Sequence, residues 1–326
     1  MASGFRHTLL RLLGKPPDRS ALRPQVLERA PLQGCIRERV SYLVEPGERV
    51  SAYLFLPERA GPRPAVLCIH QHHREYHLGK SEPAGLSGAP EQFYALELAK
   101  RGYVTFAPDA LGFEERQHQT LRGADFERFV AMRLLTEGSS LQRKMLWDLQ
   151  QGLTYLTSRP EVDRRRLGCI GHSLGGQETL FLCAVDRRLA VGVSSCGFSS
   201  YRAIFDAGIL HNLAAYVPGL LRYGDLERVL SLVAPRPFLI LAGSEDPLFP
   251  LAGVQATVQG AGRAYARAKD RLRLEAFPGG HEFSLPMREA AYAWLDRWLR
   301  PSPPPSPPRG ERGKERGRRA ARQGDL

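Results

Sequence analysis

Cysteine is scarce in this 326-residue sequence, and its placement excludes several classes of protein. No two of the five cysteines form a C-x-x-C pair and their number is odd, which argues against a disulfide framework and a C-x-x-C metal or redox motif. Cys68 and Cys169 lie in apolar segments, where a thiol behaves as a small hydrophobic group. We therefore expect a protein of a reducing compartment, located in the cytoplasm.

Long apolar runs are missing as well. No stretch approaches the roughly 20 apolar residues that a membrane-spanning helix requires. The leucine pairs at 9–10 and 12–13 are separated by Arg11, so this run is too short for the apolar region of a secretion signal. Neither membrane insertion nor secretion is expected.

The net charge of +12 comes mostly from the two ends of the chain. Residues 1–30 carry six basic and two acidic side chains, and residues 301–326 carry seven basic and three acidic ones, which leaves only +4 for the remainder. A basic segment can attract polyanions without specificity. We interpret the charges at both ends as solvated and predict no specific nucleic-acid partner.

The composition divides the chain into three parts. Residues 1–30 are expected to form a helical extension, with an amphipathic helix, a proline break and a second short helical piece around Val26-Leu27. Residues 31–300 have the length and apolar content of one large domain. A run of prolines followed by an arginine-rich end predicts that 301–326 is a disordered tail.

Within the large domain, strand and helix patterns alternate. Segments 36–44 and 49–56 alternate with a period of two around a Glu-Pro-Gly-Glu turn, which predicts an antiparallel hairpin. A continuous apolar run at 65–69 predicts a buried strand, and it is followed by a helix at 93–100 and another strand at 103–107. Strand, helix and strand in this order predict an α/β fold with a mostly parallel sheet and helices on both faces.

The pentapeptide Gly-His-Ser-Leu-Gly at 171–175 is the strongest candidate for a chemical motif. An apolar strand enters it and an apolar helix leaves it, which is the context of a nucleophile elbow. The sharp turn leaves no room for side chains two residues before and after the serine, so Gly171 and Gly175 meet the requirement, and Gly176 lets the helix pack close to the strand. Ser173 is therefore the candidate nucleophile.

An acid and a histidine should follow the serine, each at the end of a strand. The buried strand at 236–243 runs into a loop that carries Asp246, and the strand at 272–277 runs into a loop that carries His281. Both residues occur in the required order. A small helical insertion at 200–233 precedes the acid strand and is the best candidate for a cap that selects the substrate.

Three motifs together resemble the α/β-hydrolase superfamily: Gly-His-Ser-Leu-Gly-Gly at 171–176, Gly-Ser-Glu-Asp-Pro at 243–247 and Gly-Gly-His-Glu-Phe at 279–283. The chain is most similar to the dienelactone-hydrolase-like and acetyl-esterase-like serine esterases, over roughly 37–299. The resemblance implies a Ser173-Asp246-His281 triad. Dienelactone hydrolases proper use a cysteine nucleophile, so the serine here indicates a serine esterase.

The resemblance also implies an oxyanion hole. One donor is expected to be the backbone N–H of Leu174, the residue after the nucleophile. The second is expected from the loop that follows strand 65–69, where either His72 or Gln71 would supply it. Many relatives have a glycine after the first histidine of this loop, where this chain has Gln71.

Three further residues are candidates for the substrate pocket: His172 beside the nucleophile, Phe198 after the next strand, and Glu114 in a charged loop. An aromatic residue at the position of Phe198 is more often part of the core, and loop charges such as Glu114 are more often solvated. Asp109 also ends a strand, but it precedes Ser173 in the chain, so we interpret it as a turn and network residue.

We therefore expect a hydrolase that cleaves carboxylic esters of small molecules through an acyl-enzyme, without metal or cofactor. A serine peptidase or amidase of the same fold is the first alternative. A metal-dependent hydrolase using the histidines of 70–77 is the second, but an H-x-H-x-D-H motif starting at His70 would need an acid at 74 and a histidine at 75, where Arg74 and Glu75 stand. The oligomeric state is left open.

Overall fold

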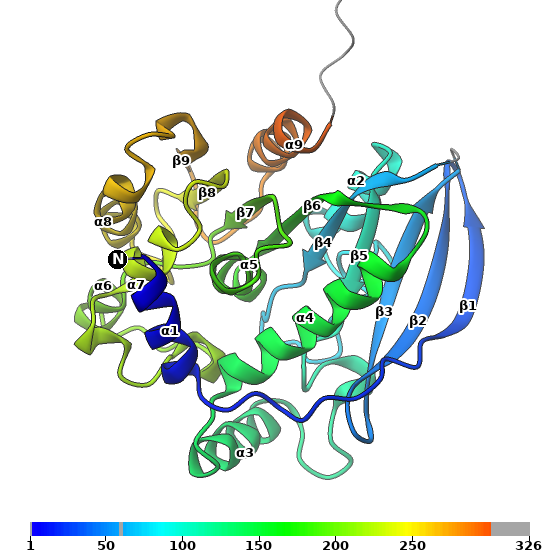
Figure 1. Cartoon of the computed structure of the whole chain (residues 1–326), viewed down its shortest axis with the longest axis horizontal. Helices are drawn as coiled ribbons and strands as arrows, with labels where there is room; N and C mark the ends of the chain where they lie inside the picture. Colours follow the sequence, from blue (N-terminus) through cyan, green and yellow to red (C-terminus); the bar gives the residue numbers. More distant parts are fainter. Residues whose placement is uncertain (1, 59–60, 301–326) are drawn as a thin grey trace, which may run out of the picture.

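A twisted sheet of nine strands runs through the molecule (Figure 1). The structure is a computed structural model that describes residues 2–58 and 61–300. The predicted tail at 301–326 lies outside the described residues. The strands are β1 (Gln25–Leu32), β2 (Cys35–Glu45), β3 (Glu48–Pro57), β4 (Arg63–Ile69), β5 (Val104–Pro108), β6 (Val162–His172), β7 (Val191–Ser195), β8 (Phe238–Gly243) and β9 (Leu272–Phe277).

The strand order is β1-β2-β3-β5-β4-β6-β7-β8-β9. The pairs from β1 to β5 are antiparallel, and all pairs from β5 onward are parallel. The predicted hairpin is confirmed, since β2 and β3 contain the two alternating segments and pair through a tight turn. The mostly parallel sheet with an antiparallel N-terminal part is confirmed as well.

Strand β4 shows why the parallel half has continuous apolar strands. Val66 and Cys68 point into one core, while Leu67 and Ile69 point into the core on the opposite face. Because both faces are covered by helices, neither set of alternating side chains meets water, and the strand needs apolar residues at every position.

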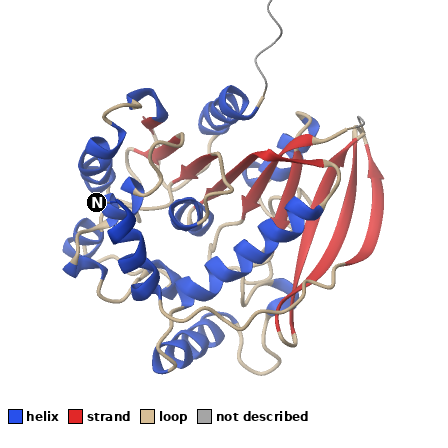
Figure 2. Ribbon diagram, in the orientation of Figure 1, coloured by secondary structure: helices blue, strands red, loops and turns tan. Residues whose placement is uncertain are grey.

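Helices cover both faces of the sheet (Figure 2). Helices α1, α4 and α5 pack on one face of the sheet, and α2 and α9 pack on the other (Figure 1). The α-helices are α1 (Ala2–Leu13), α2 (Tyr94–Lys100), α3 (Gly123–Thr136), α4 (Leu141–Ser158), α5 (Leu174–Val185), α6 (Tyr201–Asp206), α7 (Leu226–Ser231), α8 (Leu251–Ala261) and α9 (Leu285–Leu299). The 3₁₀ turns are η1 (Pro90–Gln92), η2 (Glu114–Arg116), η3 (Leu213–Ala215), η4 (Leu220–Arg222), η5 (Gly262–Tyr265) and η6 (Lys269–Arg271).

The N-terminal extension is part of the fold. Helix α1 inserts Phe5, Leu9 and Leu13 into the main core, as its amphipathic pattern predicts. The predicted helical piece around Val26-Leu27 is wrong, because this segment is the edge strand β1 and the predicted boundary at residue 30 falls inside it. The side chains of Val26 and Leu27 are both exposed, so the sequence has no alternation of buried and exposed residues here that would predict a strand. Pairing with β2 determines the conformation.

The segment 200–233 is helical, as predicted, and contains α6, η3, η4 and α7. Its η3 turn contacts α3 and α4, and its α7 contacts α5 and α8. The insertion therefore lies against the helix that follows the Gly-His-Ser-Leu-Gly turn.

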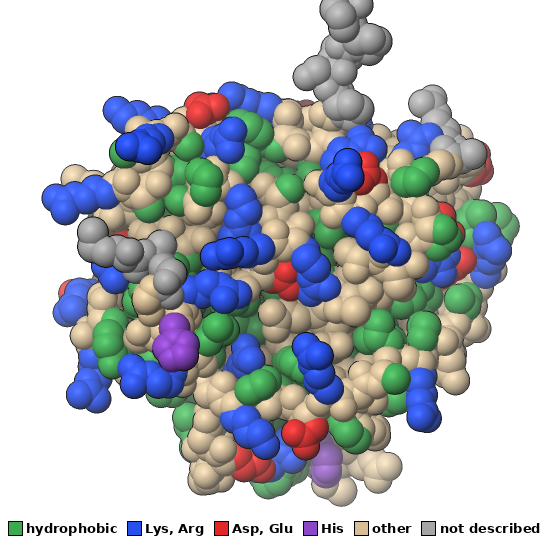
Figure 3. Space-filling view, viewed as in Figure 1, with side chains coloured by type: hydrophobic (Ala, Val, Ile, Leu, Met, Phe, Trp, Pro, Cys, Tyr) green, Lys and Arg blue, Asp and Glu red, His purple; other side chains and the backbone are tan. Residues whose placement is uncertain are grey.

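None of the helices in the described part of the chain combines the length and hydropathy needed to cross a membrane. Figure 3 shows lysine and arginine side chains scattered over the face built by α1 and α4, with fewer acidic side chains between them. On this face the basic groups are spread out and do not form one continuous stripe.

Candidate active site

Ser173 lies in the turn between β6 and α5 with a strained backbone. Its φ of 54° and ψ of −120° place a residue with a side chain in a region that is normally accessible only to glycine. A hydrogen bond from the N–H of Ser173 to the carbonyl oxygen of Ser195, at 2.9 Å, helps to hold this conformation. The turn presents the serine hydroxyl at the carboxyl edge of the sheet.

The glycines around the serine have the predicted steric roles. A Cβ atom on Gly171 would overlap the backbone of Gly175, and one on Gly175 would overlap the carbonyl oxygen of Ile69 in β4. A Cβ atom on Gly176 would lie 2.8 Å from the Cα atom of Gly197. These glycines let α5 begin in direct contact with the ends of β4 and β7.

The three predicted triad side chains meet at this edge. His281, after β9, has its Nε2 atom 2.9 Å from the Oγ atom of Ser173, and its Nδ1 atom is 2.9 Å from the Oδ2 atom of Asp246, after β8. Strands β6, β8 and β9 are all parallel, so their carboxyl ends lie on the same edge although the residues are far apart in the sequence.

Asp246 is held as a carboxylate. Burial raises its pKa, but hydrogen bonds and charge interaction with His281 and the N–H groups of Leu248 and Phe249 outweigh this, so its pKa lies below the usual value. Oδ1 accepts from Leu248 and Phe249 at 2.8 and 3.1 Å, which leaves Oδ2 for the imidazole. The negative charge is therefore next to Nδ1 of His281, where it favours a proton on that nitrogen.

His172, predicted as a pocket residue, is buried beside the triad. Its ring centroid lies 4.9 Å from that of His281, and its ring stacks on Phe283 at 5.7 Å. Burial and the neighbouring His281 lower the pKa of His172 well below the usual value, so this ring is neutral. Only 1% of the His172 surface is exposed, so this ring packs against the ring of His281 and does not line an open pocket.

Backbone donors suitable for an oxyanion hole are present near Ser173. Leu174 is the first residue of α5, and its N–H has no hydrogen-bond partner among the described residues. The N–H groups of Gln71 and His72, at the end of β4, are likewise without a partner within that part of the chain. All three donors stay available, so the choice between Gln71 and His72 stays open.

Each side chain of the predicted oxyanion loop at 70–72 has its own hydrogen-bond partner. Gln71 donates to both carboxylate oxygens of Glu82, at 3.0 and 3.1 Å, and His72 lies 2.7 Å from Glu127. His70 is buried and its Nε2 atom accepts from the N–H of Ala110. The side chains of Gln71, His72 and His70 are thus hydrogen-bonded within the protein.

This loop does not gather metal ligands. Among the described residues, two groups of at least three potential ligands lie within 4.8 Å of one another, and neither contains a histidine of 70–77. One group includes Asp246 and His281 of the predicted triad, and the other consists of carboxylates that already bind Lys80. His73 and His77, in the same loop, are exposed.

Two predicted pocket residues are placed elsewhere. Phe198 is 2% exposed and belongs to the main core, so it packs inside the fold. Glu114 forms an ion pair with the buried Lys80 and accepts hydrogen bonds from the N–H groups of Gly79 and Ser81, so it belongs to a charged cluster around Lys80. Asp109 is confirmed as a network residue, since its carboxylate lies 2.7 Å from the ammonium of Lys80.

Several residues near the site have no clear signal in the sequence. Cys196 lies beside Asp246, and burial together with that carboxylate raises the thiol pKa to about 12, so it is not a thiolate. His211 of the insertion stacks on Phe249 at 4.4 Å, and Phe249 lies 5.6 Å from His281. The insertion thus reaches the loop that carries the acid.

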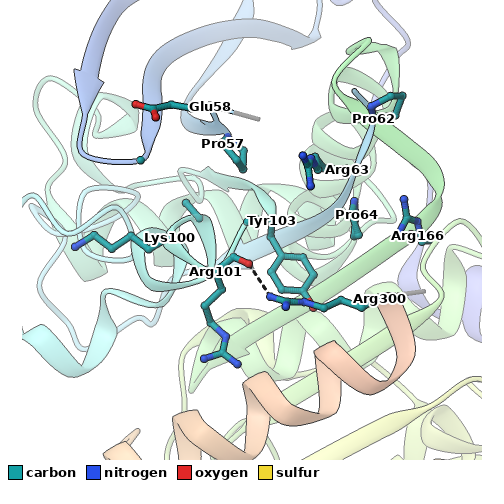
Figure 4. A pocket seen from close by; sticks show the side chains of 13 residues that line it. Pro57, Glu58, Pro62, Arg63, Pro64, Lys100, Arg101, Tyr103, Arg166 and Arg300 are labelled. Atoms are coloured by element: carbon teal, nitrogen blue, oxygen red, sulfur yellow. Dashed lines mark hydrogen bonds between the residues drawn. The ribbon is translucent and has the colours of Figure 1, made fainter. Parts of the chain in front are cut away.

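A cavity of about 620 Å³ lies at the opposite edge of the sheet, near the start of β4 (Figure 4). Basic side chains line it, but Arg166 is paired with Asp163, and Arg300 and Arg101 share Asp296. The guanidinium of Arg300 also reaches the backbone of Arg101, as the dashed line in Figure 4 shows. This cavity is remote from Ser173 and belongs to a different part of the fold.

The topology, the strained serine turn and the helices on both faces define an α/β-hydrolase fold. The sequence model of the dienelactone hydrolase family matches residues 50–301, so the chain belongs to that family. It is also 33% identical, over 305 residues, to YtaP of Bacillus subtilis strain 168, whose name assigns it only provisionally as a hydrolase. That similarity covers 92% of this chain and 100% of YtaP.

Solved structures share the fold at low sequence identity. A Bacteroides fragilis protein, provisionally described as an acetyl xylan esterase, matches with a TM-score of 0.69 and 20% identity over 85% of this chain and 74% of its own. A glucuronoyl esterase from Solibacter usitatus matches with a TM-score of 0.66 and 16% identity over 89% and 91% of the two chains. Acetyl xylan esterase 1 from a Thermoanaerobacterium species matches with a TM-score of 0.60 and 17% identity over 90% and 98%.

Proposed function

We propose that this protein is a serine hydrolase that cleaves carboxylic esters through an acyl-enzyme, with Ser173 as nucleophile, His281 as general base and acid, and Asp246 as the residue that orients His281. The observation that carries the proposal is the pair of 2.9 Å contacts that join the three side chains at one edge of the sheet. Nucleophile, base and orienting acid are within hydrogen-bonding reach in the order that acyl transfer requires.

The first half of the reaction follows from these contacts. With Asp246 holding a proton on Nδ1, the Nε2 atom of His281 is free to accept the proton of Ser173 as its Oγ attacks the ester carbonyl. Negative charge then develops on the carbonyl oxygen. The free N–H of Leu174 and one N–H of the loop at 71–72 are available to stabilise it, and loss of one such donor typically costs about 10²- to 10³-fold in rate.

The second half uses the same groups. His281 gives its proton to the leaving alcohol, which produces an ester between the acyl group and Ser173. Water then attacks this ester with His281 again acting as the base, and the acid and free serine are released.

Esters are favoured as substrates because two of the solved structures that share the fold are named as a glucuronoyl esterase and an acetyl xylan esterase. A peptidase or amidase of this fold is the alternative, and parallel assays with a p-nitrophenyl ester and an aminoacyl p-nitroanilide separate the two. The proposal expects turnover of the ester alone.

The test of the nucleophile is Ser173→Ala. We expect hydrolysis of p-nitrophenyl acetate and labelling by a fluorophosphonate both to be lost while thermal unfolding stays close to that of the wild type. The matched control is Ser87→Ala, which alters an exposed serine. Activity of the Ser173→Ala protein close to the wild-type level would overturn the proposal.

A further inference from the structure

Helix α3 carries a buried carboxylate, Glu127, that is bonded to two separate parts of the site. Its Oε2 atom lies 2.7 Å from Nε2 of His72 and accepts from the hydroxyl of Tyr76 at 2.9 Å. Its Oε1 atom accepts from the N–H of Leu213 at 2.7 Å. His72 and Tyr76 belong to the loop after β4, and Leu213 begins η3 of the insertion at 200–233.

We propose that Glu127 is a positioning residue that couples the insertion to the oxyanion loop, so that the placement of η3 determines how the backbone of the loop faces the nucleophile. The inference rests on the proposed function of Ser173. It assigns a role to a residue that has no hydrogen bond to Ser173, Asp246 or His281 and acts through His72, Tyr76 and Leu213.

The packing around Glu127 places it where such a coupling is physically direct. Val130, Ala131 and Leu134 follow it on the same face of α3, at the spacing of one helical stripe. These three residues pack in one cluster with Leu174, the residue after the nucleophile, and with Ala214 of η3. Glu127 is thus the polar end of a stripe that contacts both the nucleophile turn and the insertion.

The bonds of Glu127 are those of an ionised carboxylate. Burial raises its pKa, but the hydrogen bond and charge interaction with His72 and the bonds from Leu213 and Tyr76 outweigh this and bring it below the usual value. Nδ1 of His72 accepts from the N–H of Arg74 at 3.2 Å, so this network assigns the ring proton to Nε2, which donates to Glu127. A buried charge with three donors resists small displacements more than an apolar contact does.

In Glu127→Gln the amide has one oxygen and one NH₂ group, so it can accept either from the loop donors or from the N–H of Leu213, but not from both. On the other side its NH₂ group meets another donor. Because this displaces the loop or η3, we expect Glu127→Gln to lower kcat/KM for p-nitrophenyl acetate by about 10- to 100-fold per active site, mostly in kcat. The affinity for an alkyl trifluoromethyl ketone, which forms an oxyanion on Ser173, should fall by a similar factor. The control is Glu137→Gln, at the exposed end of the same helix.

A second pair of variants tests the coupling without touching Glu127. Leu213 is the first residue of η3 and follows Asn212, whose ψ is 158°, so proline fits this backbone. Leu213→Pro removes the N–H group that donates to Glu127 and also part of the side chain that packs on the α3 cluster. Leu213→Ala loses a similar part of the side chain and keeps the N–H. We expect Leu213→Pro to lower kcat about 10-fold relative to Leu213→Ala. In the Glu127→Gln background this difference should largely disappear, because the two changes remove the same link.

Active sites are counted by titration with a fluorophosphonate, so that loss of folded protein is separated from loss of rate. The inference is overturned if Glu127→Gln changes the number of sites or the melting temperature but not kcat per site, or if Leu213→Pro and Leu213→Ala have equal kcat. Failure of the proposed function is a different result, namely retained hydrolysis by Ser173→Ala. If that variant is inactive and Glu127→Gln is as fast as the wild type, only the inference fails.

Discussion

Replacement of Asp246 by asparagine gives a prediction whose direction can be worked out from the hydrogen bonds. One carboxylate oxygen accepts from the N–H groups of Leu248 and Phe249, and the other faces Nδ1 of His281. In Asp246→Asn the amide oxygen must face the two backbone donors, because an NH₂ group there would meet N–H groups. The NH₂ group then points at Nδ1 and stabilises the tautomer of His281 that carries its proton on Nε2. That tautomer cannot accept the proton of Ser173.

The expected loss in kcat for p-nitrophenyl acetate is about 10³- to 10⁴-fold near pH 7, as for other triads with the wrong tautomer. At about 1.4 kcal/mol per factor of ten, this corresponds to about 4–6 kcal/mol of transition-state stabilisation. Because asparagine has nearly the same shape and keeps the two backbone hydrogen bonds, the melting temperature should change little.

The assay is steady-state hydrolysis with active sites counted by fluorophosphonate, and the control is Asp270→Asn, an exposed aspartate paired with Arg297 on the surface. If Asp246→Asn keeps more than about a tenth of the wild-type kcat, Asp246 does not set the tautomer of His281 and the triad assignment is refuted.

Three further predictions concern stability. Gly175→Ala should prevent correct folding or lower the melting temperature strongly, because its Cβ atom would overlap a carbonyl oxygen at the end of β4; the fraction of soluble, titratable protein measures this. Lys80→Met leaves the buried carboxylate of Asp109 without its cation and should cost about 3–5 kcal/mol in urea unfolding, whereas Lys269→Met, on the surface, should cost almost nothing. Burial raises the pKa of Glu82 from 4.5 to about 7, so the folded protein binds this proton more tightly than the unfolded chain, and stability is lost as pH rises from about 4.5 to about 7. Glu82→Gln should remove this loss, so that its melting temperature relative to the wild type is a few degrees higher at pH 8 than at pH 5; an unchanged pH dependence would contradict the assignment.

The sequence predicted the parts of the site that depend on short-range sterics and on chain order. The glycines around Ser173 are needed for a turn whose geometry is local, and Asp246 and His281 each lie in the loop after a strand pattern. Because the carboxyl ends of neighbouring parallel strands meet at one edge, their position after the strands was sufficient to predict that they converge.

Local pattern was misleading where the determining partner is distant in the chain. The segment around Val26-Leu27 has an apolar pair that suits a helix, but pairing with β2 makes it a strand. In the sequence, Glu114 lies in a charged loop, which suggests a solvated residue or one that contacts substrate. Only the fold shows that Lys80, 34 residues earlier, forms an ion pair with it.

The amino-acid sequence by itself determined the class of fold, the nucleophile turn and the order of the three triad candidates, since each depends on residue types at short spacing. The tertiary structure alone decided which side chains surround them. Glu127 is an ordinary helical glutamate in the sequence, and it links the insertion to the loop after β4 because α3 brings its carboxylate to within 2.7 Å of both Nε2 of His72 and the backbone N of Leu213. These two contacts join residues that are separated by 55 and 86 positions in the sequence. They depend on how the helices pack, which no local periodicity of the sequence predicts.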